Sequence, residues 1–166
     1  MPANIQREAT KPGEESVWDY PRPPKLEAVD KHIEVIFNGV TIADTHHAMR
    51  VLETSHPPVY YIPLEDVRSE FLTRTQRTSY CEFKGIANYY TITVEGKSAP
   101  DAAWTYLTPT LEFRPIEGYV AVYPSLMDAC FVDGEQARPQ AGGFYGGWIT
   151  KEIKGPFKGE QGTSGW

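Results

Sequence analysis

The chain has 166 residues, of which 40% are hydrophobic, so one domain can bury a core without help from disulfides or metals. A net charge of −6 without a cluster of Lys or Arg argues against nucleic acid as a partner. No apolar run approaches the roughly 20 residues of a membrane span, and residues 1–16 contain no apolar signal segment. We therefore expect a cytoplasmic protein that binds no membrane.

Proline, glycine and charge divide the chain into three parts. Residues 1–25 contain 5 of the 14 Pro and predict an extended arm, because Pro lacks the backbone N–H that helices and central strands use. Residues 26–132 carry the whole net charge of −6 and form a predicted single β domain. Residues 133–166 contain 9 of the 14 Gly together with large apolar side chains. Because a disordered segment has few such side chains, we expect this tail to pack on the body or on a neighbouring chain.

The first part of the body predicts a β-hairpin. HIEVIF at 32–37 and VTIAD at 40–44 flank the pair Asn38-Gly39, which accepts the positive φ angles of a type I′ turn. Residues 47–53 fit a strand or a helix equally well.

The next part predicts a strand followed by one short helix. VYYI at 59–62 fits a strand, and Pro63 then stands where helices often begin. Apolar side chains follow at helical spacing over 64–72: Leu64, Val67, Phe71 and Leu72.

Strands dominate the rest of the body. RTSYCEF at 77–83 and the run IANYYTITV at 86–94 predict two long strands. Period two assigns to the buried face of the second strand Ile86, Asn88, Tyr90, Ile92 and Val94. Shorter strands are predicted at 103–107, 111–113, 118–123 and 129–132. So many strands with one helix predict a mainly antiparallel fold with two sheets or an open barrel.

Aromatic side chains are the strongest indication of a binding site, since they make up 13% of the chain. Several of them lie on predicted strands: Tyr61, Tyr90, Trp104 and Tyr106. Rings of this kind form the walls of small-molecule pockets. The alternative is that they fill the core between two thin sheets.

Glu53 and Lys84 are the charged candidates for that pocket. Glu53 follows an apolar stretch, so it would serve as an acceptor or as a general base with a raised pKa. Alternatively it pairs with Lys84 or Arg50, or is simply exposed. Lys84 stands at the end of a strand and would act through its charge.

Cys81 is either a reactive thiol beside an ammonium or a buried core residue. In a regular strand Cys81 and Lys84 point to opposite faces, so they meet only if Gly85 marks a turn. We name no catalytic residue.

No metal site or cofactor is predicted. Two cysteines cannot form a four-thiolate zinc site. His46, His47 and His56 are close in sequence, but neighbours in a strand point to opposite faces, so His46 and His47 cannot both join His56.

Several uncommon sequence clusters occur in a characteristic order: VLETSHPPVYYIPLEDV, SYCEFKGIANYY, AAWTY and IEGYVAVY. The sequence resembles the family called domain of unknown function 427, which is also labelled nucleotidyltransferase-like. The arm ESVWDYPRPP and the tail PQAGGFYGGWIT are similar to extensions of cyanobacterial members. The resemblance implies a β-tent, in which two antiparallel sheets meet at an angle around an aromatic ligand site.

The resemblance does not imply a reaction. Many β-tent relatives bind zinc through two C-x-x-C pairs, which this chain lacks. Nucleotidyl transfer usually needs clustered acidic residues for Mg²⁺ and a phosphate loop, and the body has neither a D-x-D nor a Walker motif.

Three functional hypotheses remain. The leading one is a domain that binds a polar or cationic-aromatic small molecule in an aromatic-walled pocket with Glu53 and Lys84. The second is an enzyme that uses Glu53 as acid or base in the same pocket. The third is an interaction module whose tail docks on a partner, with a homodimer as one form of that docking.

Overall fold

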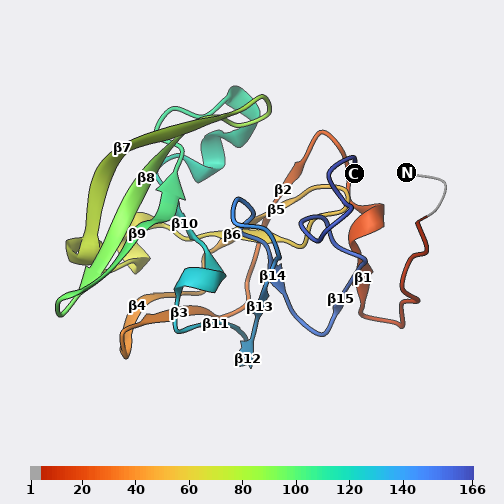
Figure 1. Cartoon of the computed structure of the whole chain (residues 1–166), viewed down its shortest axis with the longest axis horizontal. Helices are drawn as coiled ribbons and strands as arrows, with labels where there is room; N and C mark the ends of the chain where they lie inside the picture. The colour runs from red at the N-terminus through yellow and green to blue at the C-terminus, as the bar shows by residue number, and fades with distance from the viewer. Residues whose placement is uncertain (1–4) are drawn as a thin grey trace.

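The structure is a computed structural model that describes residues 5–166, and short strands dominate it (Figure 1). One four-stranded antiparallel sheet has the order β10-β9-β8-β7. Its strands are β7 (Leu72–Cys81), β8 (Gly85–Val94), β9 (Lys97–Thr105) and β10 (Val120–Val122).

A second four-stranded antiparallel sheet has the order β12-β11-β3-β4. Its strands are β3 (Ile33–Phe37), β4 (Val40–Thr45), β11 (Ala129–Val132) and β12 (Glu135–Gln136). A three-stranded sheet has the order β2-β5-β6 and contains β2 (Lys25–Ala28), β5 (Met49–Leu52) and β6 (Val59–Tyr61).

Two small pairs of strands complete the sheets. β13 (Arg138–Pro139) pairs antiparallel with β14 (Trp148–Ile149). β1 (Glu15–Ser16) pairs in parallel with β15 (Ile153–Lys154), so the arm and the tail are joined by backbone hydrogen bonds. The remaining regular elements are 3-10 turns: η1 (Val17–Asp19), η2 (Leu64–Asp66), η3 (Ser69–Phe71), η4 (Leu111–Ile116) and η5 (Pro124–Leu126).

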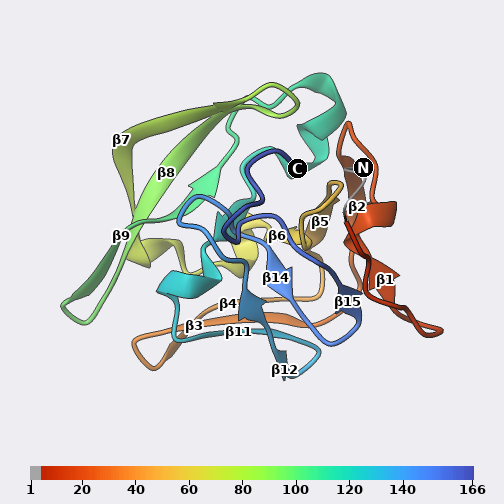
Figure 2. The same ribbon diagram turned by 45° about the vertical axis from the view of Figure 1, so that its right-hand side comes forward.

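The two larger sheets are steeply inclined to each other. β7, β8 and β9 rise along one side of the molecule, whereas β3, β4 and β11 run across its base (Figures 1 and 2). The third sheet lies between them and the arm, with an isolated bridge from Ile62 to Val120 of β10. The predicted mainly β fold of antiparallel sheets without a closed barrel is confirmed for the described residues.

The main core lies between the two inclined sheets. Apolar side chains of β3 alternate inward, where Ile33, Val35 and Phe37 are almost fully buried. Ile92 and Val94 of β8 belong to the same cluster. A second buried cluster is largely aromatic and contains Tyr61, Tyr89, Trp104, Tyr106, Phe113 and Tyr123.

The predicted hairpin at 32–44 is confirmed. β3 and β4 pair antiparallel, and Phe37 pairs with Val40 across the turn. Asn38 and Gly39 have φ angles of 48° and 75°, as a type I′ turn requires.

The predicted helix at 64–72 is wrong in form. The segment makes two separate 3-10 turns, with the extended residue Val67 between them. Val67 forms a bridge with Ala43, and the N–H of Arg68 donates to the carbonyl of Ile42 at 2.7 Å. Pairing with the neighbouring sheet therefore outweighs the local helical pattern. The predicted strand at 111–113 is also wrong, because these residues belong to η4.

The predicted buried face of 86–94 is wrong in its first half. Ala87 and Tyr89 are buried and Ile86 is 53% exposed, whereas Ile92 and Val94 are fully buried as expected. The register of β8 against β9 shifts between Tyr90 and Ile92. The alternation of β8 nevertheless continues: Tyr90, Ile92 and Val94 pack on the main core, whereas Ala87 and Tyr89 lie on the opposite face, in the aromatic cluster.

The tail after β12 contributes several fully buried side chains. Trp148 is 0% exposed, and its ring lies 4.9 Å from that of Tyr60. Trp18 of the arm donates its indole N–H to the carbonyl of Pro156 at 3.0 Å and lies edge-on to Trp166. These contacts join both ends of the chain to the sheets. Across residues 5–166, the helical segments are all too short or too polar to cross a bilayer.

Candidate functional site

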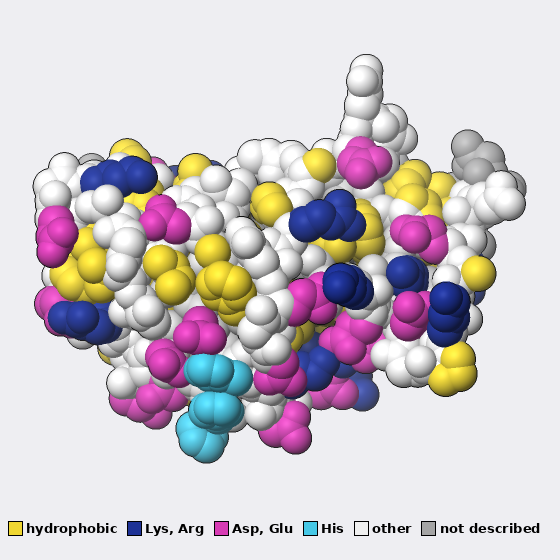
Figure 3. Space-filling model, turned by 90° about the horizontal axis from the view of Figure 1, so that it is seen from below, with side chains coloured by type: hydrophobic (Ala, Val, Ile, Leu, Met, Phe, Trp, Pro, Cys, Tyr) yellow, Lys and Arg dark blue, Asp and Glu magenta, His cyan; other side chains and the backbone are white. Residues whose placement is uncertain are grey.

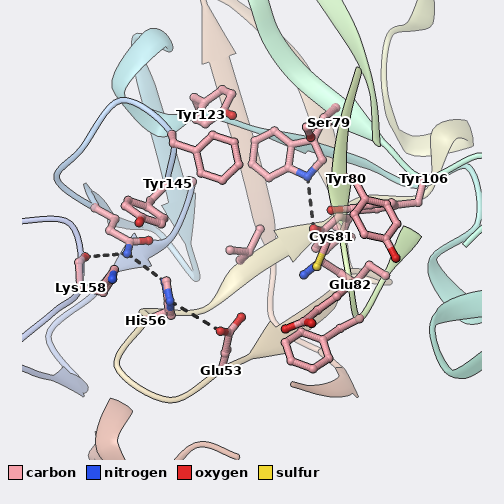
Figure 4. A pocket seen from close by; sticks show the side chains of 18 of the residues that line it. Glu53, His56, Ser79, Tyr80, Cys81, Glu82, Tyr106, Tyr123, Tyr145 and Lys158 are labelled. Carbon is pink, nitrogen blue, oxygen red and sulfur yellow. Dashed lines mark hydrogen bonds and ion pairs between the residues drawn. The ribbon is translucent and has the colours of Figure 1, made fainter. Parts of the chain in front are cut away.

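A cavity of about 460 Å³ opens where the β7–β8 hairpin, the β5–β6 connection and the tail come together (Figure 4). The second, aromatic cluster forms one wall. Ionisable side chains from the β5–β6 connection and the β7–β8 turn form the other. Five of the six predicted site residues line the cavity: Glu53, Tyr61, Lys84, Trp104 and Tyr106.

Hydrogen bonding and tilted packing fix the aromatic wall. The indole N–H of Trp104 donates to the hydroxyl of Tyr61 at 3.2 Å, and the two rings meet edge-on at 6.3 Å. Tyr123 packs on the other side of Trp104 at 4.6 Å. Burial raises the pKa of both Tyr61 and Tyr106, so these phenols stay protonated and neutral near pH 7.

Tyr90 does not line the cavity. The two faces of β8 meet different clusters, so Tyr89 faces the aromatic cluster and Tyr90 packs against the main core instead. Tyr89, which the sequence pattern placed on the wetter face, is the residue of this strand in the cavity wall. Its hydroxyl lies 2.9 Å from that of Ser79.

Glu53 lies in the connection after β5, with its side chain 24% exposed. Its Oε2 atom is 3.1 Å from Arg22 of the arm and 3.8 Å from Nε2 of His56. Among residues 5–166, the alternative of an ion pair with Lys84 or Arg50 is not found. Arg50 points to the other side of its strand and binds Glu15 and Glu27 at 2.9 and 2.7 Å.

His56 and Gln140 form a polar unit that the sequence did not reveal as such. The backbone N–H of Gly147 donates to Oε1 of Gln140, so the amide nitrogen of Gln140 donates to the carbonyl of Lys158. The same nitrogen lies 3.2 Å from Nδ1 of His56, which must therefore be the acceptor.

This arrangement fixes the tautomer of His56. With Nδ1 accepting from Gln140, the ring proton sits on Nε2 and points toward Glu53 (Figure 4). Burial, together with the positive charges of Arg22, Lys158 and Lys84, lowers the pKa of His56 to about 4 against the opposing effect of Glu53. His56 is neutral near pH 7. Its pairing with Gln140 spans 84 residues, and no local pattern predicts it.

Lys84 occupies the turn between β7 and β8. Gly85 follows it with φ at 106°, so the turn that could bring Lys84 to Cys81 is present. The Lys84 ammonium lies 5.9 and 5.8 Å from the ring centres of Tyr106 and Phe113. Burial lowers the pKa of Lys84, but the electrostatic influence of Tyr61, Cys81 and Glu53 outweighs it and raises the pKa overall.

Cys81 lines the same cavity and is partly exposed, so it is not a core residue. Its proximity to Lys84 is one of the causes that raise the pKa of that ammonium. Cys130 is the buried cysteine, at 1% exposure, and burial raises the pKa of its thiol to about 12.

The tail covers the cavity. The ring of Tyr145 lies 5.4 Å from that of His56. Gly146 packs so closely on Trp104 that an added Cβ would overlap the indole ring, with Cζ3 only 3.1 Å away. The run GGFYGGW of the tail thus lets the backbone approach an aromatic ring.

The three histidines considered together in the sequence do not converge. His56 lines the cavity, whereas His46 stacks on His32 with ring centres 4.5 Å apart. Figure 3 shows histidine side chains on the lower face of the molecule among acidic ones. Nε2 of His32 lies 2.6 Å from Asp44, and the hydrogen bond that the ring N–H donates to this carboxylate raises the pKa of His32. Together with Glu34, these groups bring potential ligand atoms within 4.8 Å of one another.

Comparison with known proteins shows the family to which the chain belongs. None of the curated proteins compared with the chain matches it. The model of one family, described as Domain of unknown function (DUF427), matches residues 25–133. The match includes Glu53, Lys84 and the aromatic wall, whereas Arg22 and the tail over the cavity lie outside it. Because the matched segment covers well over half of the sequence, the chain belongs to the family Domain of unknown function (DUF427).

Proposed function

We propose that this protein binds a small organic molecule in the cavity between the β7–β8 turn, the β5–β6 connection and the tail. One observation carries the proposal: an aromatic wall and several ionisable side chains from separate segments face a single space of about 460 Å³. Small-molecule sites typically measure about 300–1,000 Å³ and combine apolar walls with a few polar groups.

The chemistry of the lining favours binding over turnover. Neither ring nitrogen of His56 can take up a proton from a ligand. Nδ1 accepts a hydrogen bond from Gln140, and Nε2 already carries the ring proton, which points toward Glu53. The neighbouring amine of Lys84 has a raised pKa and is protonated near pH 7, so it cannot serve as the base that removes the proton of the Cys81 thiol. The alternative of an enzyme therefore rests on Glu53 alone.

The tail acts as part of this site in the proposal, and not as a docking arm for another protein. Most apolar side chains of the tail that could contact another protein are buried by the rest of the chain. Trp148, Ile149 and Ile153 are 0, 5 and 3% exposed. Phe144 is the exception at 59%, and it stands at the rim of the cavity.

Cys81 offers a direct test of occupancy, with Cys130 as a matched control in the same molecule. Compounds that raise the melting temperature are added before alkylation with iodoacetamide, and each thiol is followed by peptide mass spectrometry. We expect such compounds to slow alkylation of Cys81 at least tenfold, while Cys130 stays unreacted with or without them. Prior modification of Cys81 with N-ethylmaleimide should abolish binding, and Cys81→Ser should retain it.

Two results would overturn the proposal. One is a library in which no compound raises the melting temperature. The other is a set of stabilising compounds that leave the alkylation rate of Cys81 unchanged. Glu53→Gln separates binding from turnover: an enzyme would retain affinity for its substrate in this variant and lose the reaction.

A further inference from the structure

The cationic side chains that line the cavity differ in whether a carboxylate or a carbonyl oxygen already binds them. Arg22 contacts the carboxylate of Glu53 at 3.1 Å and donates to the carbonyl of Thr54 at 2.9 Å. Lys158 donates to the carbonyl of Ser164 at 2.8 Å. Lys84 forms no ion pair with any carboxylate among residues 5–166, although it lines the same space.

Glu53 influences the Lys84 ammonium electrostatically, but neither carboxylate that lines the cavity forms an ion pair with it. Its aromatic neighbours are Tyr106 and Phe113, at 5.9 and 5.8 Å. The phenols of Tyr61 and Tyr106 are neutral near pH 7, because burial raises their pKa. A partly buried ammonium has lost part of its hydration, and an anion in contact with it restores that loss through a charge-assisted hydrogen bond.

The aromatic rings next to Lys84 determine which chemical group can lie beside the anionic group of a ligand. Trp104 and Tyr106 each pack against Tyr61 at 6.3 Å with their rings inclined, so faces and edges alternate along the wall. A planar apolar group gains most from such a surface, because aromatic rings prefer offset and edge-to-face contacts.

The same inventory of charges limits how negative the ligand can be. Glu53 and Glu82 also line the cavity, and both repel further negative charge. The lining carries three cations, Arg22, Lys84 and Lys158, against these two carboxylates, so it balances one further negative charge. A nucleotide with several phosphates would need more free cations than the cavity provides.

We infer that the cavity is selective for a small monocarboxylic acid with a planar apolar body, whose carboxylate pairs with the ammonium of Lys84 while its body lies against Trp104 and Tyr106. This ligand class rests on the proposed function, and it replaces the polar or cationic-aromatic ligand expected from the sequence.

A panel of matched compounds tests the inference. For each of a benzene, an indole and a naphthalene ring, the acetic acid, acetamide and ethylamine derivatives are compared by calorimetry at pH 7. We expect at least one acid to bind, and to bind at least tenfold more tightly than its amide and its amine.

Three variants assign this preference to Lys84. Lys84→Met should reduce the affinity for the acid to that for the amide while leaving the amide unchanged. Lys84→Arg retains the charge and should retain the preference. Lys151→Met, which removes an exposed ammonium outside the cavity, should change nothing. Each variant is first checked for an unchanged melting temperature within a few degrees.

The outcomes separate the two proposals. Amides or amines that bind as well as the acids, a panel in which no acid binds, or an acid preference that survives Lys84→Met would overturn the ligand class. If compounds still protect Cys81 in those cases, the proposed binding function stands. If no compound protects Cys81 from alkylation, both the binding function and the ligand class are overturned.

Discussion

The backbone of Gly146 lies against the six-membered ring of Trp104, leaving no room there for a side chain. Gly146→Ala should therefore push the tail away from the aromatic wall. We expect a lower melting temperature and faster alkylation of Cys81, because the cover over the cavity is displaced. Gly143→Ala is the matched control, since an added Cβ there meets no atom within 4 Å. Equal behaviour of the two variants would show that the tail does not need this contact.

Trp148 should contribute far more to stability than the other large ring of its segment. It is 0% exposed, and replacing such a ring by Ala typically costs about 3–5 kcal/mol. Phe144 is 59% exposed, so Phe144→Ala should change the free energy of unfolding by less than about 0.5 kcal/mol. Urea denaturation at pH 7 measures both. A small effect of Trp148→Ala would mean that the tail is not docked in solution.

His56 should make the protein less stable in mild acid. Its pKa in the folded state is lowered to about 4 from an ordinary value of 6.5. The unfolded chain therefore takes up the proton first as the pH falls. The stabilisation from neutral His56 is complete above about pH 6.5 and is lost as the pH falls toward 4, by about 2–3 kcal/mol.

The variant His56→Gln isolates this effect from that of the carboxylates. Urea midpoints of wild type and variant, measured from pH 7.5 to pH 4, should converge as the pH decreases. His32 shows the opposite sign, because its pKa is raised by Asp44. Its contribution is present below pH 6.5 and is lost as the pH rises through its folded-state pKa. Parallel pH curves for wild type and His56→Gln would contradict the prediction.

Arg50 should anchor the arm to the sheet. Its side chain is 13% exposed and binds Glu15 of β1 and Glu27 of β2 at once. Both carboxylates are more than one third exposed, so solvent screens them, and we expect Arg50→Met to cost about 1–2 kcal/mol. Limited proteolysis within residues 5–20 should accelerate in the same variant. The exposed pair Arg68–Glu70 is the control, and Arg68→Met should cost less than about 0.5 kcal/mol.

Local chemistry made some features predictable. Asn38-Gly39 specifies a hairpin turn because both residues tolerate positive φ, and the strands around it follow from strict alternation. The composition of the strands indicated an aromatic wall and Glu53 as candidates for one cavity, and these residues do line the same space. Lys84 was placed correctly once Gly85 was considered as a turn.

Long-range relationships were not predictable in this way. Both faces of β8 are buried, each against a different cluster, and nothing in IANYYTITV tells which cluster Tyr89 or Tyr90 joins. Residues 64–72 carry a helical pattern that pairing with β4 overrides. Gln140 reaches His56 only because the tail folds back across the sheets.

The family match has a consequence for how this cavity differs between proteins. The wall and the charged groups Glu53 and Lys84 belong to the matched segment, residues 25–133, whereas Tyr145 and Gly146 belong to the tail outside it. A member without a comparable tail would present the same recess as an open bowl, from which a bound molecule escapes quickly. Extensions at the ends of the chain thus allow evolution to adjust residence time and size selectivity while the strands that hold the recess stay unchanged.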